Sequence, residues 1–219
     1  MKLYDRHGRV RERALTMTTL RGTGSAGDRL LVRFTYPNDI RGTSFLVWEH
    51  PDADDERFLY LPSLGRVRRI AGAETQESFV GTDFTYEDIS GRELDEYTYA
   101  ILDENASWAP SSGAARPAWR LESRRKHASA PFPRVVSLVL KETFIPVQAE
   151  IYNRRDERQK VYAVRRLEQV EGIWTAMAAA MTNAQEKTRT ELTIERVDYN
   201  VGLKETDFSR RELERGIVR

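Results

Sequence analysis

The stretch Asp28-Arg29-Leu30-Leu31-Val32-Arg33-Phe34 decides the fold. Successive side chains of a β-strand point to opposite faces of a sheet, so Leu30, Val32 and Phe34 are expected to share one apolar face. The same alternation recurs in short runs that turn residues separate, whereas helical periodicity is rare. This pattern is typical of an antiparallel meander and argues against a parallel α/β fold.

The alternating runs continue along the chain on both sides of this stretch. Five early runs are expected to form successive hairpins, at residues 14–20, 29–35, 43–49, 57–61 and 65–70. Further strands are expected at residues 97–103, 119–123, 135–141, 147–152, 161–168, 175–182 and 188–197. A sheet of about ten or more strands must curl to bury its apolar face. We therefore predict a mainly β fold, an open, strongly curved antiparallel β-sheet or half-barrel with a few short covering helices, in one domain spanning residues 1–219.

Three segments depart from the strand pattern. Residues 74–94 contain Thr85-Tyr86-Glu87-Asp88, which has the spacing of a helix capping box, so we expect a helical or irregular insertion over the sheet. Residues 105–117 are rich in Ser, Ala, Gly and Pro and are expected to form a mobile loop. Ser209-Arg210-Arg211-Glu212 repeats the capping-box spacing and predicts a last helical turn.

Composition excludes several classes of function. The 35 Lys and Arg residues balance 34 Asp and Glu, so the long-range field that attracts nucleic acid is missing. With 0 Cys and 3 scattered His, the chain offers no disulfide framework and suggests neither a metal site nor a catalytic triad. No stretch approaches the roughly 20 apolar residues of a membrane helix, and the first residues lack the apolar core of an export signal.

A glycine-rich motif invites a cofactor interpretation. Gly22-Thr23-Gly24-Ser25-Ala26-Gly27 matches the dinucleotide-binding fingerprint, but that mechanism needs a helix after the glycines to receive the pyrophosphate. Here an alternating strand follows. We therefore expect a hairpin loop and no cofactor.

Two groups of charged residues admit a functional interpretation. Asp83, Glu87 and Asp88 could supply the paired carboxylates of a hydrolase, although helix capping and pairing with Arg are the more common roles. Arg66 and Arg68 lie on one face of a predicted strand and are candidates for binding an anionic head group. Their alternative role is pairing with acidic neighbours at Glu74, Glu77 or Asp83.

Several blocks, taken in order, resemble the outer membrane lipoprotein-sorting proteins of the LolA/LolB superfamily of bacteria. The resemblance covers nearly the whole chain and is most specific between Phe58 and Asp88. The blocks are Leu31-Val32-Arg33-Phe34-Thr35-Tyr36-Pro37, Arg41-Gly42-Thr43-Ser44-Phe45-Leu46, Phe58-Leu59-Tyr60-Leu61-Pro62, Arg66-Val67-Arg68-Arg69-Ile70, Ser78-Phe79-Val80-Gly81-Thr82-Asp83-Phe84-Thr85-Tyr86-Glu87-Asp88, Thr188-Arg189-Thr190 and Asp207-Phe208-Ser209.

The resemblance implies an open β-barrel that is lined by apolar side chains and covered by helices. Related carriers shield the acyl chains of lipoproteins in the periplasm, and members often accompany exporters of the resistance-nodulation-division (RND) type. They begin with an export signal and an N-terminal helix, which this sequence does not show, so we expect the signal to have been removed. Arg154-Arg155-Asp156-Glu157-Arg158 replaces the glycine-containing turn that the family pattern leads us to expect.

These observations lead to one principal hypothesis, a periplasmic carrier or chaperone, not an enzyme, that binds lipid or the acyl chains of lipoproteins. Its expected partners are those acyl chains and an inner-membrane RND-type exporter, with no metal or nucleic acid. The alternative is a non-carrying envelope module, an exporter adaptor or scaffold, with a filled core. The residues expected to line the apolar pocket are Leu30, Val32, Phe34, Phe45, Val47, Phe58, Tyr60, Val135 and Val139.

Overall fold

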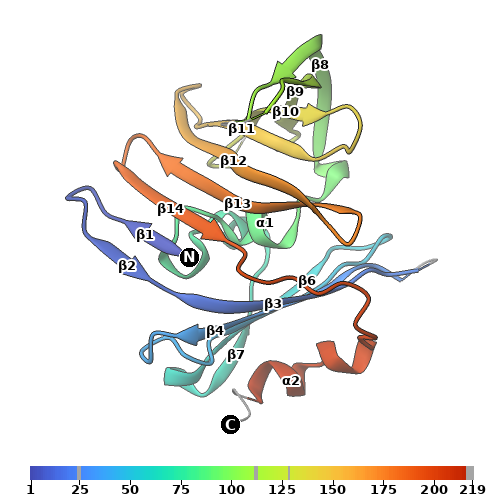
Figure 1. Ribbon diagram of the computed structural model, residues 1–219. Coiled ribbons are helices and arrows are strands. Elements are labelled where there is room, and N and C mark those ends of the chain that lie inside the picture. Colours follow the sequence, from blue (N-terminus) through green and yellow to red (C-terminus); the bar gives the residue numbers. More distant parts are fainter. Residues whose placement is uncertain (24–25, 111–112, 128, 216–219) are drawn as a thin grey trace. The chain divides into compact units, whose positions relative to one another are not determined.

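The computed structural model describes residues 1–23, 26–110, 113–127 and 129–215. The chain is mainly β, with a few short helices, and its strands form two open antiparallel sheets (Figure 1). The predicted fold class is thus confirmed, although the strands divide between two sheets where one was expected. The chain also divides into two compact units: one comprises Met1, Glu12–Thr75 and Asp198–Arg219, and the other Lys2–Arg11 and Gln76–Val197.

The first unit contains a five-stranded sheet of successive hairpins, as the sequence predicted. Its strands follow one another in the order of the chain. They are β3 (Ala14–Leu20), β4 (Arg29–Tyr36), β5 (Ser44–Trp48), β6 (Glu56–Leu61) and β7 (Arg66–Arg69). A 3-10 helix at Pro62–Leu64 joins β6 to β7, and Gly65 ends it with a φ of +57°, a conformation that glycine adopts without steric cost.

The glycine-rich stretch before β4 is a close-packed connection. A Cβ atom added at Gly27 would lie 2.0 Å from the carbonyl oxygen of Glu49, so only glycine fits there. The Asp28 N–H donates to the Glu49 carboxylate at 2.9 Å. Residues 24 and 25 of the fingerprint-like motif lie outside the described residues. As predicted, a strand and not a helix follows the glycines, so the pyrophosphate site of the fingerprint has no helix to form on.

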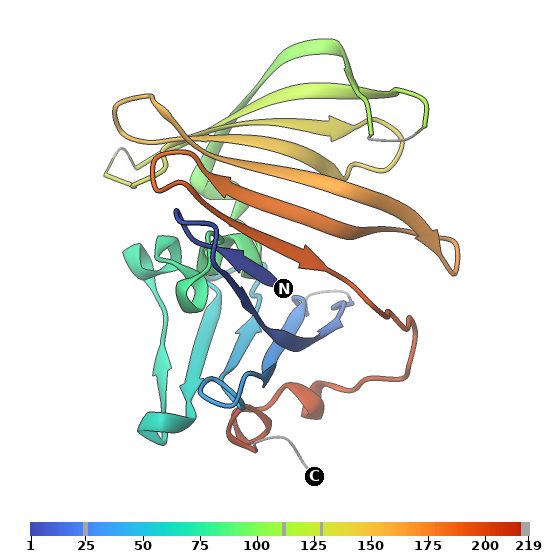
Figure 2. The same ribbon diagram turned by 60° about the vertical axis from the view of Figure 1, so that its left-hand side comes forward.

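The C-terminal segment covers one face of the five-stranded sheet. A 3-10 helix (Glu205–Phe208) leads into α2 (Arg210–Glu214), which begins where the Ser209 hydroxyl accepts from the Glu212 N–H, as its capping-box spacing predicted. Figure 2 shows α2 beside the strands of this sheet. The buried side chains that form this core are Leu31, Leu46, Phe58, Phe208 and Leu213. The Trp48 indole N–H also donates to the Phe208 carbonyl oxygen at 2.6 Å, which fixes the segment in register with β5.

The second unit contains a nine-stranded sheet in the order β2-β1-β14-β13-β12-β11-β10-β9-β8. Strand β1 pairs with β14, so strands from both ends of the sequence are neighbours in this sheet. Its strands are β1 (Lys2–Tyr4), β2 (Val10–Glu12), β8 (Tyr97–Trp108), β9 (Arg116–Arg125), β10 (Arg134–Leu140), β11 (Pro146–Tyr152), β12 (Arg158–Val170), β13 (Ile173–Asn183) and β14 (Thr188–Thr193).

The terminal strand β8 is longer and less regular than the sequence indicated. The predicted loop at residues 105–117 is shorter, because β8 continues to Trp108 and β9 already begins at Arg116. Residues 111 and 112 of this loop lie outside the described part of the chain. The pairing of β8 with β9 shifts register twice, between Ile101 and Asp103 and between Asp103 and Ala106.

The turn between β11 and β12 forms without the glycine that the family pattern led us to expect. The Asn153 side-chain oxygen accepts from the N–H groups of Arg155 at 2.9 Å and Glu157 at 3.1 Å. Asp156 takes the left-handed position with a φ of +59°. Asp tolerates this conformation better than most residues, so an Asn-Asp combination replaces glycine here.

The expected insertion is present as a series of short helices. It comprises 3-10 helices at Gly72–Gln76, Phe79–Gly81 and Leu94–Glu96 and the helix α1 (Tyr86–Ser90). The predicted capping box is confirmed, because the Thr85 hydroxyl accepts from the Asp88 N–H and the Asp88 carboxylate accepts from the Thr85 N–H. Phe84 and Ile89 then pack against Val135 and Ile151 of the sheet.

A buried ion pair attaches α1 to the sheet. Glu87 accepts from the Tyr97 hydroxyl at 3.0 Å and pairs with the guanidinium of Arg125, which also pairs with Glu96 and donates to the Tyr97 oxygen at 2.6 Å. Burial and the Glu87 charge raise the pKa of Tyr97, so its hydroxyl stays protonated as a donor. The cluster thus ties the insertion to β8 and β9.

Replacing Phe208 by Ala is expected to lower the free energy of unfolding by about 3–5 kcal/mol, because it opens a cavity under the C-terminal segment. Urea denaturation followed by circular dichroism measures this change. The matched control is Val201→Ala in the same segment, where the side chain is 59% exposed and the expected change is under about 0.5 kcal/mol. Equal stability of the two variants would show that the segment is not docked.

Glu87→Gln is expected to cost about 3 kcal/mol, because it leaves the buried Arg125 guanidinium short of one counter-charge while Glu96 remains. Glu168→Gln breaks an exposed pair with Arg166 and should cost less than about 1 kcal/mol. Thermal unfolding of both variants makes the comparison, and a Glu87→Gln protein as stable as the control contradicts the anchoring role.

Candidate ligand-binding faces

The face of the five-stranded sheet opposite the C-terminal segment is mainly apolar, and we call it the apolar face, although the buried Arg57 of β6 also lies on it, opposite Val47. Cross-strand pairs define it: Leu30 is opposite Val47, and Val32, Phe45 and Leu59 follow one another across β4, β5 and β6. Val32, Phe34 and Phe45 are no more than 1% exposed, whereas Leu30 is half-buried. The apolar residues of the face are Leu30, Val32, Phe34, Phe45, Val47 and Leu59.

The structure brings five of the nine expected pocket residues together on this face, namely Leu30, Val32, Phe34, Phe45 and Val47. It places Phe58 and Tyr60 on the other face, where Phe58 joins the core under Phe208 and Tyr60 packs against it. Grouping them with the other five was therefore wrong, because the side-chain alternation along β6 was assigned to the opposite face of the sheet. Large side chains occupy every position from 58 to 61, so alternation could not show which ones share a face, and Leu59 was missed.

The two valines expected in the pocket belong to the second unit. Val135 is 1% exposed and lies in a cluster with Phe84, Ala149, Ile151 and Met181. Val139 is only partly buried and is opposite Trp119 on β9. The pairing of β10 with β9 is regular from Arg134 to Leu140, so the two valines lie on the same side of β10, as the alternation predicted. The register shift between Leu138 and Val139 concerns the pairing with β11.

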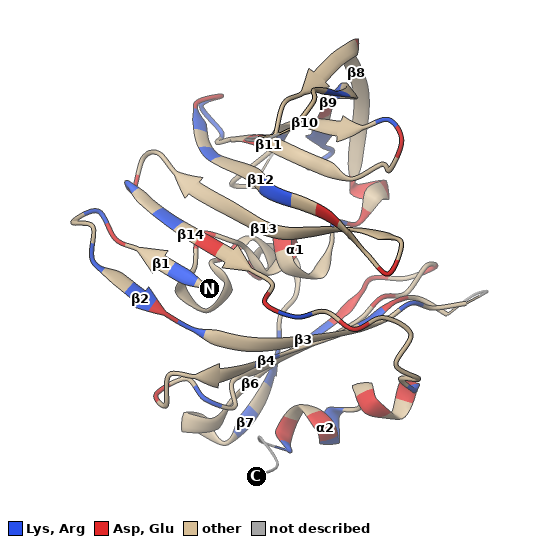
Figure 3. Ribbon diagram, in the orientation of Figure 1, with Lys and Arg blue, Asp and Glu red and all other residues tan. Residues whose placement is uncertain are grey.

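The head-group candidates Arg66 and Arg68 share a side of the sheet with the apolar face. Arg68 is opposite Leu59 and Arg66 is opposite Leu61, whereas Arg69 is opposite Phe58 and belongs to the other side. Figure 3 shows the basic residues along β7, the end strand of this sheet. Arg68 lies 3.6 Å from Glu74, one of its expected acidic partners, and both side chains are exposed. The apolar face therefore borders a basic edge.

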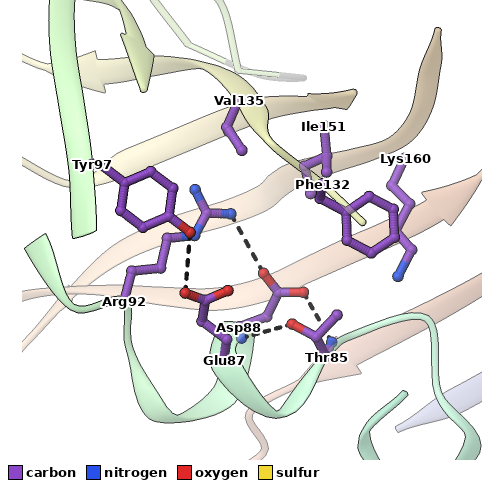
Figure 4. A pocket seen from close by; sticks show the side chains of 9 residues that line it. All are labelled: Thr85, Glu87, Asp88, Arg92, Tyr97, Phe132, Val135, Ile151 and Lys160. Carbon is purple, nitrogen blue, oxygen red and sulfur yellow. Dashed lines mark hydrogen bonds and ion pairs between the residues drawn. The ribbon is translucent and has the colours of Figure 1, made fainter. Parts of the chain in front are cut away.

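The carboxylates considered for hydrolysis have structural partners. Asp83 accepts from the hydroxyls of Thr188 and Thr190, and Glu87 belongs to the Arg125 cluster. Asp88 caps α1 and lies 3.5 Å from Arg92, as Figure 4 shows. The cavity beside Glu87 and Asp88 measures about 10 Å³, which is room for about one water molecule. It offers no space for a sugar ring.

Among the described residues, no group of three or more His, Cys, Asp or Glu side chains could hold a metal ion. Within that same part of the chain, none of the helices has the length and apolar character needed to cross a membrane.

Comparison with known proteins places this fold in a family. The sequence pattern of a family described as "Uncharacterized protein" matches residues 26–215. No curated protein matches the chain.

Solved structures provide the structural relatives. A domain from Vibrio parahaemolyticus, described as an outer membrane lipoprotein-sorting protein, is 28% identical with a TM-score of 0.85, over 97% of this chain and 88% of that one. A DUF1329 family protein from Desulfovibrio piger is 28% identical with a TM-score of 0.81 over the same shares. A LolA superfamily protein from Nitrosomonas europaea, 15% identical with a TM-score of 0.62, covers 96% of this chain and 87% of its own and shows the fold alone.

These matches bear out the resemblance that the sequence blocks suggested. The family pattern includes β4 to β7, the insertion and most of the C-terminal segment, and the structural matches extend over nearly the whole chain. The chain therefore belongs to the family matched over residues 26–215, and its fold is LolA-like.

Proposed function

We propose that this protein is a periplasmic carrier or chaperone that binds a lipid, or the acyl chains of a lipoprotein, on its apolar face. The observation that carries the proposal is the composition of that face. Three adjacent strands contribute the aliphatic and aromatic side chains of Leu30, Val32, Phe34, Phe45, Val47 and Leu59, while the chain covers the opposite face with its own Phe208 and Leu213. The one charged residue that β6 adds to this face, Arg57, is buried and pairs with Asp55 at 2.8 Å. The description of the Vibrio domain as a lipoprotein-sorting protein supports the same role.

Apolar burial supplies enough free energy for such binding. Each methylene transferred from water onto an apolar surface contributes about 0.8 kcal/mol, so a dozen methylenes contribute roughly 10 kcal/mol before the entropic costs of binding. Carriage forms and breaks no covalent bond. The carboxylates Asp83, Glu87 and Asp88 already serve as hydrogen-bond and ion-pair partners within the fold, which agrees with a binding protein rather than an enzyme.

The basic edge beside the apolar face suits a ligand with an anionic end. Arg66 and Arg68 project to the same side as Leu59 and Leu61, so a chain lying across the strands could extend its carboxylate or phosphate toward β7. The guanidinium group binds both anions in a bidentate manner. We assign the head group to Arg66 and Arg68 and the acyl chain to the apolar face.

Location and partners follow from the family resemblance. LolA-like carriers work between the two membranes of the bacterial envelope, and an RND-type exporter of the inner membrane is the protein partner that we propose. Affinity purification from a cross-linked envelope fraction tests this link, and recovery of no inner-membrane transporter contradicts it.

A second function, a non-carrying envelope module with a filled core, is favoured by one observation. Val32, Phe34 and Phe45 are no more than 1% exposed, as side chains of a closed core would be. In that case no acyl ligand would bind. Native mass spectrometry of the protein purified from bacterial envelopes, followed by lipid extraction, distinguishes the two functions.

Leu30→Asp is expected to weaken acyl binding at least about tenfold, because a carboxylate on the apolar face must be desolvated by the ligand. Leu20→Asp is the matched control. Leu20 is equally half-buried on the neighbouring strand β3, but it packs against the core on the covered face. Displacement of 11-(dansylamino)undecanoic acid, measured by fluorescence, gives the affinities, and circular dichroism verifies folding.

Binding of the fluorescent acid by neither the wild type nor Leu20→Asp would remove the carrier function. Equal affinities for the two variants would move the binding site away from the apolar face.

The double variant Arg66→Gln/Arg68→Gln is expected to weaken binding of the same anionic probe about two- to tenfold, because exposed guanidinium groups contribute modestly. Binding of uncharged monoolein should stay unchanged. Arg69→Gln, on the other side of the same strand, serves as the control and should bind both ligands as the wild type does. A drop with Arg69→Gln alone would argue for a general charge effect.

A further inference from the structure

A polar cavity of about 280 Å³ lies within the unit that carries the nine-stranded sheet. The β1–β2 hairpin, the segment before α1 and the strands β12 to β14 each contribute to its wall. The residues that matter for its chemistry are Tyr4, Arg11, Asp83, Lys160, Asn183 and Thr190. The cavity belongs to a different unit from the apolar face, and hydroxyl, amide and charged groups dominate its lining.

Lys160 is the buried cation of this cavity. Lys160 is only 7% exposed, and it lies on β12 between its cross-strand neighbours Ile151 on β11 and Asn183 on β13. The ammonium donates to the Asp83 carbonyl oxygen at 2.8 Å and lies 4.7 Å from the centre of the Phe132 ring. Figure 4 shows Lys160 beside Phe132.

The ammonium of Lys160 lacks a full counter-charge. Among the described residues no carboxylate oxygen comes within 4.0 Å of it, and its contacts are a peptide carbonyl and a ring face. Burial lowers the pKa of Lys160, and the charges of Asp88 and Asp83 offset this only in part. A buried charge is costly unless an opposite charge pairs with it.

Three acidic residues, Asp5, Asp83 and Glu186, also line the cavity. The Asp83 carboxylate accepts from the Thr188 and Thr190 hydroxyls, and Asp5 accepts from the Arg9 side chain at 2.6 Å. Glu186 is exposed at the wall of the cavity. Arg11, also exposed, forms no ion pair within the described part of the chain and adds a second positive charge to the lining.

We propose that this cavity binds a small anionic group, a carboxylate or phosphate, with the Lys160 ammonium as its principal counter-charge and Arg11 as the second. The anion completes the pairing that the fold leaves open at Lys160. A volume of about 280 Å³ lies at the lower end of the range for ligand pockets, so it suits a small metabolite or the polar end of a larger molecule. The site stands independently of acyl binding on the apolar face.

Inorganic phosphate and acetate are the probes for a free anion. Their titration into ¹⁵N-labelled wild-type protein at constant ionic strength is expected to shift the backbone amide signals of Asp83, Asn183 and Thr190 saturably. Lys160→Met keeps the aliphatic stem against Phe132 and removes the charge, and it should raise the Kd at least tenfold. Lys141→Met is the matched control, because Lys141 also lies over an aromatic ring, Trp119 at 5.6 Å, outside the cavity. It should bind as the wild type does.

Vesicles distinguish a lipid head group from a free anion. Co-sedimentation with dioleoylphosphatidic acid vesicles that depends on Lys160, without saturable phosphate or acetate binding and without binding to dioleoylphosphatidylcholine vesicles, identifies a lipid head group as the source. Lys160→Gln replaces the Met variant if the latter fails to fold. Two results overturn the proposal: saturable binding of none of these probes by the wild type, or equal affinity in the wild type and both Lys160 variants.

Discussion

The constraint on which the first unit depends is that β4, β5 and β6 are apolar on both faces. A strand with one apolar face needs one covering layer, but Leu31, Leu46 and Phe58 on one side and Val32, Phe45 and Leu59 on the other require two. The chain supplies the first layer from its far end, through Phe208 and Leu213. The opposite side is the apolar face, on which we propose that the ligand binds.

The same principle explains the form of the second unit. Its sheet is wide, and the insertion places Phe84 and Ile89 against Val135 and Ile151, where the Glu87–Arg125 pair holds α1 in place. Specific polar contacts therefore position the apolar ones. The side chains of this cluster pack closely against one another. The larger cavity of this unit is the polar one around Lys160.

The sequence predicted the parts of this architecture that depend on local chemistry. The five early hairpins, the capping box at Thr85 and Asp88, and the last helical turn after Ser209 follow from side-chain alternation and from short-range hydrogen bonds, and all three are present. Family blocks predicted the LolA-like fold. The sequence could not show which side chains of β6 point to which face, because four consecutive large side chains give no alternation. Docking of Phe208 was also missed, since contacts over about 160 residues leave no local pattern. Lys160 immediately precedes the predicted strand at residues 161–168, where a lysine is usually taken for a surface residue.

Strand β8 sets a limit on the size of the nine-stranded sheet. It is the end strand, its side chains are exposed on both sides over most of its length, and two register shifts interrupt its pairing with β9. A further strand could pair with β8 only if its N–H and C=O groups matched a backbone whose own groups are no longer evenly spaced. In addition, the Asn105 N–H already donates to the Asp103 carboxylate. The sheet thus ends through distortion instead of closure, which protects a long open edge from self-association at high concentration.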